Sequence, residues 1–514
     1  MRDSSENSPE SNRGHAEGFV HPETPRGLTS FREFRQIQRN RAASMPISVH
    51  KCRDLNGNRN GGIRLTARGL LWLAILALLG GASFWGWQHL ESNPPVIMAP
   101  ESILLGSDPQ SIEIGIQDPD SGLRVVSVRL LAPSGSRSLL DQTYPGHWSS
   151  GGGPGSRSDN LNLLLDANAL QVPDGPATLV IDTRDWSWRD GLTGNRTELS
   201  IPVVIDTKPP QVRVESGLTY MYRGGSAAAV YKVEEESTSH GVQVGEAFFP
   251  GWPHPAGGSD RRVALFAVPV ETPQGTPVEI IATDAAGNRQ AVPFPARVLE
   301  RVFRESELPL SNTFIAKVAE PLAQRARLDS ASPAATFRAV NETLRAQNEA
   351  TIRESLSEPS PQPLWQGAFQ QWPGSQVMSR FAEDRTYVYE GKPISEARHY
   401  GFDLAATARA PVSAAGAGQV VLAGDLGIYG LCVIIDHGLG LASLYGHLST
   451  IDVSVGEEVR KGQRIGRSGE TGLAAGDHLH FAFLIGDHYV DPLEWWDPKW
   501  VRSHIGVRLE RSDR

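Results

Sequence analysis

The chain has 514 residues and a formal net charge of −9, from 49 Lys and Arg against 58 Asp and Glu. This acidic balance excludes the basic footprint of a nucleic-acid-binding protein, so we expect no nucleic-acid partner. The length allows several domains, and a content of only two cysteines excludes a disulfide framework.

Residues 1–68 are polar and rich in Arg, Ser, Asn and Gly, which predicts a largely disordered cytoplasmic tail. The following run, GLLWLAILALLGGASFWGW at residues 69–87, contains no charged side chain. At about 1.5 Å per residue it is just long enough to cross the roughly 30 Å apolar core of a bilayer. We therefore predict one transmembrane helix over residues 69–88.

The charges that flank this run predict its orientation. Four arginines lie shortly before it, at Arg53, Arg59, Arg64 and Arg68. No Lys or Arg follows it until Arg124. The positive-inside rule then places residues 1–68 in the cytoplasm and the rest outside, on the periplasmic face of a cytoplasmic (inner) membrane.

A cleaved signal peptide is the alternative interpretation of this run, because GGAS contains small residues. The run is longer than the usual signal core and lacks an A-x-A site, so we favour an uncleaved anchor. A start at Met45 would shorten the tail without altering the topology.

Residues 94–300 contain short alternating apolar stretches separated by Gly, Pro, Asp and Asn, which is typical of strands. Their spacing predicts two Ig-like β-sandwiches, over 94–207 and 208–300, with the boundary in VVIDTKPP. TDAAGN at 283–288 predicts a turn near the end of the second sandwich. TGNRTELSIPVVIDT, near the end of the first sandwich, resembles that segment. We expect these domains to act as spacers or to bind cell-envelope protein partners.

Residues 301–360 have helical apolar spacing and strong helix formers, so they predict two or three helices followed by a linker. Pro321 is expected to break or kink the first helix. The segment could pack on the next domain or cover its cleft as a regulatory element, and we favour packing.

Five polar side chains with metal chemistry follow in three short motifs. HYGFD contains His399 and Asp403, LYGHL contains His447, and HLHF contains His478 and His480. If HLHFAFLI is a strand, both of its imidazoles point to one face, where one can bind a metal and the other can reach a bound water. Two histidines and a carboxylate suit zinc and leave a fourth position for water.

Three other residues in this region favour structural interpretations. His437, in IIDHGLGL, is expected to close a turn between strands, and His488 is expected to lie in the turn GDHYV. Cys432, in the apolar run LCVII, is expected to be a buried strand residue.

The segment from about residue 376 to 500 resembles the lysostaphin/LytM-type zinc endopeptidases of bacterial cell walls. The matching text is HYGFDLAA, APVSAAGAGQVV, YGLCVIIDHGLGLASLYGHLS, VGEEVRKGQRIGRSGETG and DHLHFAFLIGDHYVDPLEW. The resemblance implies an antiparallel β domain over 364–500 with its zinc in a groove. The ligands it implies are His399, Asp403 and His480, and the residues it implies beside the catalytic water are His447 and His478.

The chain departs from this family in RAPV at 409–412, where GTPV is usual, and in FAEDR at 381–385, where a glycine usually follows the phenylalanine. Neither departure touches an implied ligand. The complete set of five residues predicts an active enzyme that binds one Zn²⁺ per chain, with residues 501–514 as a C-terminal tail.

The expected protein is thus multidomain and mainly β. Its predicted function is that of a membrane-anchored zinc metalloendopeptidase that hydrolyses the peptide cross-links or stems of peptidoglycan. Two other functions stay open: a non-catalytic activator of another wall hydrolase, and a binding module in which the Ig-like domains dominate.

Overall fold

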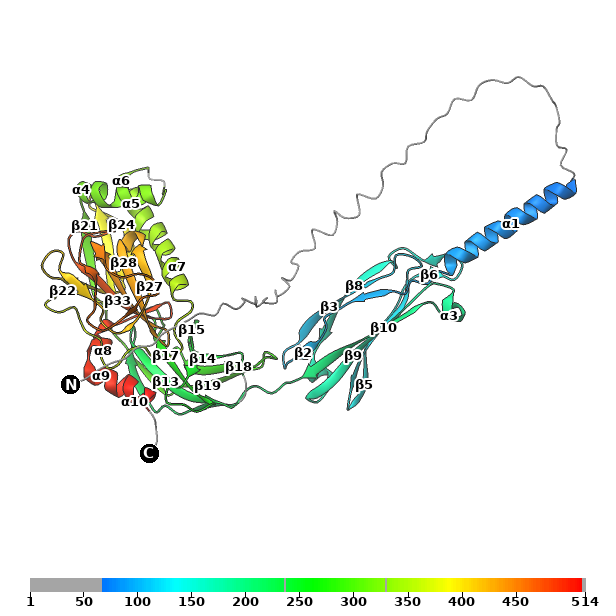
Figure 1. Cartoon of the computed structure of the whole chain (residues 1–514), viewed down its shortest axis with the longest axis horizontal. Helices are drawn as coiled ribbons and strands as arrows, with labels where there is room; N and C mark the ends of the chain where they lie inside the picture. The colour runs from blue at the N-terminus through cyan, green and yellow to red at the C-terminus, as the bar shows by residue number, and fades with distance from the viewer. Residues whose placement is uncertain (1–66, 235–236, 329–330, 511–514) are drawn as a thin grey trace, which may run out of the picture. The chain divides into compact units, whose positions relative to one another are not determined.

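The computed structural model describes residues 67–234, 237–328 and 331–510. The cytoplasmic tail predicted over residues 1–68 lies almost entirely outside the described residues, as do residues 511–514. Within them the chain is mainly β, as predicted, with one long apolar helix ahead of the strands (Figure 1).

The apolar helix, α1, spans Ala67–His89, close to the predicted residues 69–88. It is long and apolar enough to cross a membrane, and none of its side chains is buried. Within residues 67–234, 237–328 and 331–510, no other helix is both long enough and apolar enough to cross a membrane.

The first β region consists of two sheets that share one apolar core. The smaller sheet runs in the order β1 (Val96–Met98), β3 (Gln110–Gln117), β8 (Ser158–Leu165). The larger runs in the order β2 (Ile103–Leu105), β10 (Arg196–Ile205), β9 (Gly175–Asp185), β4 (Leu123–Ala132), β5 (Gly135–Thr143). Alternate residues of β3 and β4 are buried between the sheets, as the period-two apolar pattern of the sequence requires. Short connecting elements are β6 (Gly146–His147), β7 (Gly151–Gly152), α2 (Ala167–Leu170) and α3 (Arg189–Leu192).

The second β region likewise contains two main sheets, each of four strands. One runs in the order β11 (Val212–Val214), β13 (Ser226–Val233), β17 (Arg261–Ala267), β16 (Trp252–Pro253). The other runs in the order β15 (Ala247–Pro250), β14 (Ser239–Val244), β18 (Val278–Thr283), β19 (Arg289–Pro293), and β12 (Thr219–Tyr222) pairs separately with β20 (Ala296–Leu299). The core of this region is continuous with that of the C-terminal domain.

The segment predicted to be helical begins instead with a strand, β21 (Glu305–Leu310), which pairs in parallel with β23 (Glu383–Tyr389). The helical prediction is wrong for these residues because hydrogen bonds to a strand more than 70 residues away decide their conformation. Helical turns then follow: α4 (Asn312–Phe314), η2 (Ile315–Ala319), α5 (Glu320–Arg325), α6 (Pro333–Arg338), η3 (Ala339–Leu344) and α7 (Arg345–Ser355).

Pro321 does not end this helical path. It stands in the first turn of α5, where a missing N–H is tolerated, and the preceding residues Ala319 and Glu320 keep right-handed helical dihedrals. Buried side chains such as Ile315 and Phe337 join the core of the C-terminal domain, so the helices pack on that domain.

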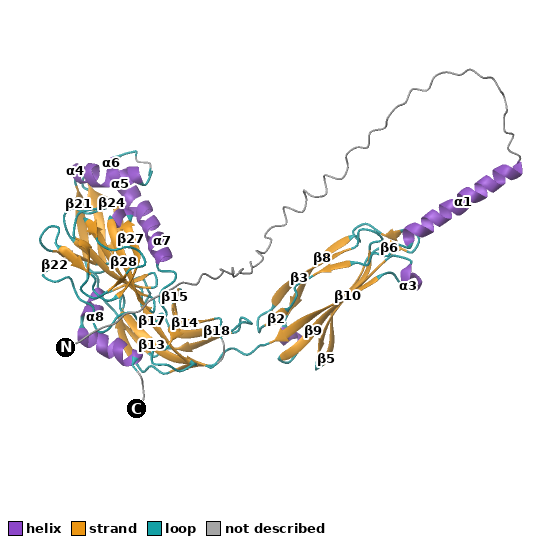
Figure 2. Cartoon of the chain, viewed as in Figure 1, coloured by secondary structure: helices purple, strands orange, loops and turns teal. Residues whose placement is uncertain are grey.

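The C-terminal domain is built on a large antiparallel sheet (Figure 2). Its order is β22 (Gln376–Ser379), β25 (Phe402–Ala405), β33 (Leu479–Ile485), β29 (Leu441–Leu448), β28 (Leu431–Gly438), β27 (Gly418–Asp425), β31 (Glu458–Val459), with β34 (His488–Val490) beside β33. Every residue of β29 and β33 is buried, which explains why apolar residues dominate both strands.

Two smaller sheets complete the domain. The first contains β21, β23 and β24 (Lys392–His399), and the second contains β26 (Pro411–Ser413), β32 (Arg464–Arg467) and β30 (Thr450–Ile451). The short helix η4 (Gly427–Tyr429) lies between β27 and β28.

The residues predicted to form a C-terminal tail are helical as far as residue 509. The chain ends in α8 (Pro492–Trp496), α9 (Pro498–Trp500), η5 (Val501–Gly506) and α10 (Val507–Leu509). Val501 and Ile505 are buried, and Arg508 Nη2 donates to Thr219 Oγ1 at 2.6 Å. Contacts with the second β region therefore order a segment whose polar sequence predicts a tail.

Candidate active site

The three predicted ligands come from the ends of three strands in two sheets. His399 is the last residue of β24, Asp403 lies in β25, and His480 lies in β33. The antiparallel register of β25 and β33 sets Asp403 directly opposite His480. Side chains opposite each other on one face of a sheet are close enough to share a ligand.

Gly401, between the two ligands of HYGFD, leaves room for the third. A Cβ at this position would lie 2.6 Å from Cε1 and 2.8 Å from Nε2 of His480. Only a residue without a side chain allows the His480 ring to approach this closely.

Three donor atoms of these residues form a nearly equilateral triangle. His399 Nε2 lies 2.9 Å from Asp403 Oδ1 and 3.0 Å from His480 Nδ1. His480 Nδ1 lies 3.1 Å from Asp403 Oδ1. Atoms bound tetrahedrally to zinc at about 2.0–2.1 Å lie roughly 3.3 Å apart, so this triangle fits a zinc ion closely.

The hydrogen bonds of His399 leave the correct nitrogen facing the triangle. Its Nδ1 lies 3.1 Å from the carbonyl oxygen of Arg380, which can only accept, so Nδ1 carries the proton. Nε2 therefore presents a lone pair to the triangle, in the arrangement common for metal-binding histidines.

The third ligand, Asp403, is held in its charged form. Burial alone would raise the pKa of this carboxyl, but His399, His478 and His480 outweigh burial and hold the pKa well below its usual value. Arg385 Nη2 donates to Asp403 Oδ2 at 2.9 Å, on the side away from the triangle. One oxygen of the carboxylate is thus available to a metal while the other binds a guanidinium.

Arg385 was not predicted from sequence, although it lies in the noted FAEDR segment. Ser379 Oγ accepts from its Nη2 at 2.8 Å, and Glu383 Oε2 accepts from its Nε at 3.3 Å. Its side chain is 17% exposed, so the ion pair with Asp403 is largely shielded from water. A basic residue shortly before HYGFD was the available signal, but nothing local linked it to Asp403.

His447 and His478, the two residues predicted to flank the catalytic water, lie beside the triangle. Their ring centroids are 4.7 Å apart, and His478 Nε2 lies 3.6 Å from Asp403 Oδ1. Each donates from Nδ1 to a carbonyl oxygen at 2.8 Å, that of Thr471 for His447 and that of Gly476 for His478. In both rings Nε2 is therefore the nitrogen left to handle a proton.

The two imidazoles have different electrostatic surroundings. Burial, together with His478 and His480, lowers the pKa of His447 to about 3. Burial also opposes the charge on His478, but the hydrogen bond and charge of Asp403 outweigh it and raise the pKa. His447 also has a positive φ of 61°, which for a residue other than glycine is an uncommon conformation typical of functional sites.

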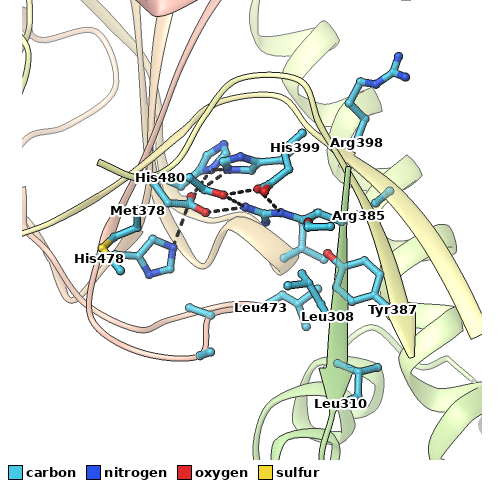
Figure 3. A pocket seen from close by; sticks show the side chains of 18 of the residues that line it. Leu308, Leu310, Met378, Arg385, Tyr387, Arg398, His399, Leu473, His478 and His480 are labelled. Atoms are coloured by element: carbon cyan, nitrogen blue, oxygen red, sulfur yellow. Dashed lines mark hydrogen bonds and ion pairs between the residues drawn. The ribbon is translucent and has the colours of Figure 1, made fainter. Parts of the chain in front are cut away.

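A cavity of about 710 Å³ opens over the five predicted residues (Figure 3). Its far wall comes from the segment upstream, which supplies Leu308 and Leu310 on β21 and Phe314 on α4. These lining residues were not predicted from the sequence. The alternation in ESELPL was their signal, but it is too short to distinguish a strand from a helix end.

Two other histidines of the domain lie away from the cleft. His437 lies inside β28 and is fully buried, where Nδ1 donates to the carbonyl oxygen of Ala417 at 2.7 Å, so the prediction that it closes a turn is wrong in position. His488 is the first residue of β34, directly after the turn at Gly486, and its ring lies 5.3 Å from that of Phe249. Cys432 is buried in β28, as predicted.

Residues 397–492, which carry the whole candidate site, match the model of Peptidase family M23. The chain carries an M23 peptidase domain of the LytM type at its C-terminus. The resemblance inferred from HYGFD and the motifs after it is thereby confirmed.

Two curated relatives each match a quarter of this chain or less. Peptidoglycan DD-endopeptidase ShyA of Vibrio cholerae is 35% identical over 134 residues, which cover 25% of this chain and 30% of ShyA. Murein hydrolase activator EnvC of Escherichia coli is 38% identical over 100 residues, covering 20% of this chain and 24% of EnvC. The chain thus matches less than a third of the length of either relative.

Among solved structures, a putative peptidase M23 from Pseudomonas aeruginosa covers 53% of this chain and 93% of its own, at 22% identity and a TM-score of 0.33.

Proposed function

We propose that this protein is a membrane-anchored zinc endopeptidase that cuts the peptide cross-links or stems of peptidoglycan. The observation that carries the proposal is the triangle of His399 Nε2, Asp403 Oδ1 and His480 Nδ1, with sides of 2.9, 3.0 and 3.1 Å. It supplies three of the four positions of a catalytic zinc site and leaves one open.

A zinc ion held by these three residues would lower the pKa of a bound water and polarise the carbonyl group of the substrate. The chain supplies the rest. His447 and His478 present their Nε2 atoms beside the triangle, where one can accept the proton of the attacking water and the other can donate to the developing oxyanion. Arg385 fixes the plane of the Asp403 carboxylate.

The cleft suits an extended peptide. It is bounded by β21 on one side and by the loop that contains Leu473 on the other (Figure 3). Both walls present apolar side chains, and the lining also includes charged side chains such as Arg304 and Arg345. Such a cleft can hold a peptide that carries both aliphatic groups and carboxylates.

The similarity to an activator, EnvC, makes a non-catalytic role the second candidate. A protein that only activates another hydrolase has no need for a complete ligand triangle with two imidazoles beside it. The presence of all five side chains in one cleft favours the enzyme.

We further propose that α1 anchors the chain in the inner membrane with its N-terminus inside, so that the β regions and the M23 domain lie in the periplasm. The supporting observations are the length and apolar composition of α1 and the arginines that precede it. We propose that the two β regions are Ig-like modules that space the enzyme or bind envelope proteins.

The test uses the detergent-solubilised full chain and its His480→Ala variant. We would measure zinc by elemental analysis and new amino groups released from purified peptidoglycan. Stoichiometric zinc with release of amines, both absent from the variant, is the expected result. Zinc binding without release would contradict the peptidase proposal, and equal cleavage by the variant would contradict the site.

A further inference from the structure

Three carboxylates converge at the start of the first β region, far along the chain from the M23 motifs. Glu91 lies two residues after the end of α1, Asp118 directly follows β3, and Asp185 is the last residue of β9. A carboxylate oxygen from each lies within 4.8 Å of the others.

No basic side chain among the described residues forms an ion pair with any of the three. Their hydrogen-bond donors are uncharged: Asn195 Nδ2 donates to Asp185 Oδ2 at 2.8 Å and to Glu91 Oε1 at 2.9 Å, and Ser121 Oγ donates to Glu91 Oε1 at 3.1 Å. Burial raises the pKa of Asp118 and of Glu91, and the nearby carboxylate of Asp185 adds to both shifts.

Asp118 provides an independent indication of a ligand. It is 2% exposed, and its Oδ2 is buried with no hydrogen-bond partner in the part of the chain that the structure describes. Its Oδ1 accepts from the backbone N–H of Asp120 at 3.0 Å. A buried carboxylate oxygen without a donor is costly unless a cation or a proton binds it.

The second β region shows which part of this cluster is structural. Asn288 donates to Asp284 from its backbone N at 2.9 Å and from Nδ2 at 2.8 Å, in the same way that Asn195 donates to Asp185 at 2.7 and 2.8 Å. The preceding linkers also correspond, ESNPP at 91–95 and DTKPP at 206–210.

The difference between the two regions lies in the acids around the shared pair. Asn288 Nδ2 donates to the backbone oxygen of Asp206, and Asn195 Nδ2 donates likewise to the backbone oxygen of Glu91 at 3.3 Å, but Asn195 Nδ2 also donates to the carboxylate of Glu91. Of these two regions, only the first gathers three carboxylates within 4.8 Å, among the residues described. The Asp–Asn pair and its contact with the linker backbone are thus shared structural features, whereas among the described residues the carboxylates of Glu91 and Asp118 converge on the pair in the first region alone and need another explanation.

We propose that Glu91, Asp118 and Asp185 form a calcium-binding site. All the converging donors are oxygens, which suit a hard cation. Two oxygens that share a calcium ion at about 2.4 Å are at most about 4.8 Å apart, which matches the cluster. Because Glu91 belongs to the linker after α1, the bound ion joins this linker to the first β region and stiffens the connection.

The test uses the full chain in detergent, with zinc present at a fixed concentration. Binding of Tb³⁺, a luminescent stand-in for calcium, is measured together with its displacement by Ca²⁺, and thermal unfolding is followed with and without Ca²⁺ at constant ionic strength. The variants are Asp118→Asn, Asp185→Asn and Glu91→Gln. Asp174→Asn is the matched control, since Asp174 precedes the opposite end of β9 and accepts from Thr207.

We expect one Ca²⁺-displaceable Tb³⁺ per chain, weakened at least tenfold in the three cluster variants and unchanged in the control. Without Ca²⁺, Asp118→Asn should unfold at a higher temperature than the parent chain, because it removes repulsion, and Ca²⁺ should reverse this order. Binding in Asp118→Asn and Glu91→Gln within twofold of the parent would overturn the proposal. The proposal would also be overturned if the unfolding temperature rose at acidic pH but did not respond to Ca²⁺, because a proton shared by the carboxylates would then take the place of the cation. Glu91→Gln alters a partly exposed linker residue, so it keeps the test decisive if the buried variants do not fold.

Discussion

Arg385 Nη2 donates to Asp403 Oδ2 at 2.9 Å, while Oδ1 of the same carboxylate lies 2.9 Å from His399 Nε2. The carboxylate is therefore shared between a guanidinium and the ligand triangle. A partner of this kind orients a metal ligand and holds it charged before the metal arrives.

Replacement of Arg385 should weaken zinc binding without removing a ligand. We expect Arg385→Met to lower zinc affinity by about 10–100-fold. The zinc affinity of Arg385→Lys should lie between those of the parent chain and Arg385→Met. A lysine keeps the charge but not the fork of donors that also contacts Ser379. Competition for zinc against a chromophoric chelator measures this. Unchanged affinity in Arg385→Met would show that Arg385 does not position Asp403.

The two imidazoles beside the triangle should be separable from the ligands. His447→Ala and His478→Ala are each expected to keep zinc and to lose activity by about 10²–10⁴-fold, the usual loss for a general acid or base. His480→Ala should lose zinc and activity together. Zinc content and peptidoglycan cleavage, measured on the same preparations, distinguish these outcomes, and loss of zinc from His478→Ala would make it a ligand instead.

Gly401→Ala should act on the site through space alone. The added methyl group would lie 2.6 Å from the ring of His480 and 2.7 Å from the backbone oxygen of Phe481, so both the ring and the adjoining backbone of β33 must shift. We expect zinc affinity to fall by more than tenfold with the fold preserved. The control is Gly476→Ala, where a Cβ meets no atom within 4 Å. Chelator competition and far-UV circular dichroism make the comparison, and normal zinc binding in Gly401→Ala would contradict it.

Glu494 should make stability depend on pH. Burial raises its pKa to about 8, although Ser226 donates to Oε2 from N and from Oγ, both at 2.8 Å. An unfolded glutamate titrates near about 4.3, so between these values the folded state holds a proton that the unfolded state has released. The proton on Glu494 therefore adds to the free energy of unfolding. This stabilisation is fully present below about pH 4.3 and is lost as pH rises through 8, and in between the free energy of unfolding falls by about 1.4 kcal/mol per pH unit.

Glu494→Gln removes that titration and keeps an acceptor for Ser226. From pH 5 to pH 8, the unfolding temperature of the parent chain should therefore fall relative to that of the variant. Differential scanning calorimetry of both proteins across this range provides the measurement. Parallel pH profiles would show that Glu494 has an ordinary pKa.

The five candidate site residues were predictable because their signals are local. HYGFD and HLHF each place two functional side chains within a few residues, and the aliphatic residues around them identify the strands that carry them. Period-two alternation likewise identified β3, β4 and β9, whose buried faces form the core of the first β region.

What the sequence did not reveal depends on contacts between distant segments. Arg385 acquires its role only when β23 is placed beside β25, and the helices after residue 500 are ordered by Thr219, nearly 300 residues earlier. The carboxylates of Glu91, Asp118 and Asp185 are likewise separated by dozens of residues. No periodicity within a short window contains such information.

The parallel pairing of β21 with β23 also has a practical consequence for dissection of the molecule. The family match begins at residue 397, yet one wall of the cleft is a strand that begins at Glu305. A fragment cut at the edge of the family match would lose β21, β22, β23 and all but the last three residues of β24, and would expose the backbone groups of β25 that β22 satisfies. Exposed strand edges recruit other chains, so such a fragment invites aggregation. The smallest portion of this protein that can be purified with an intact cleft is therefore set by hydrogen bonds across 70 residues of chain, and not by the limits of sequence similarity.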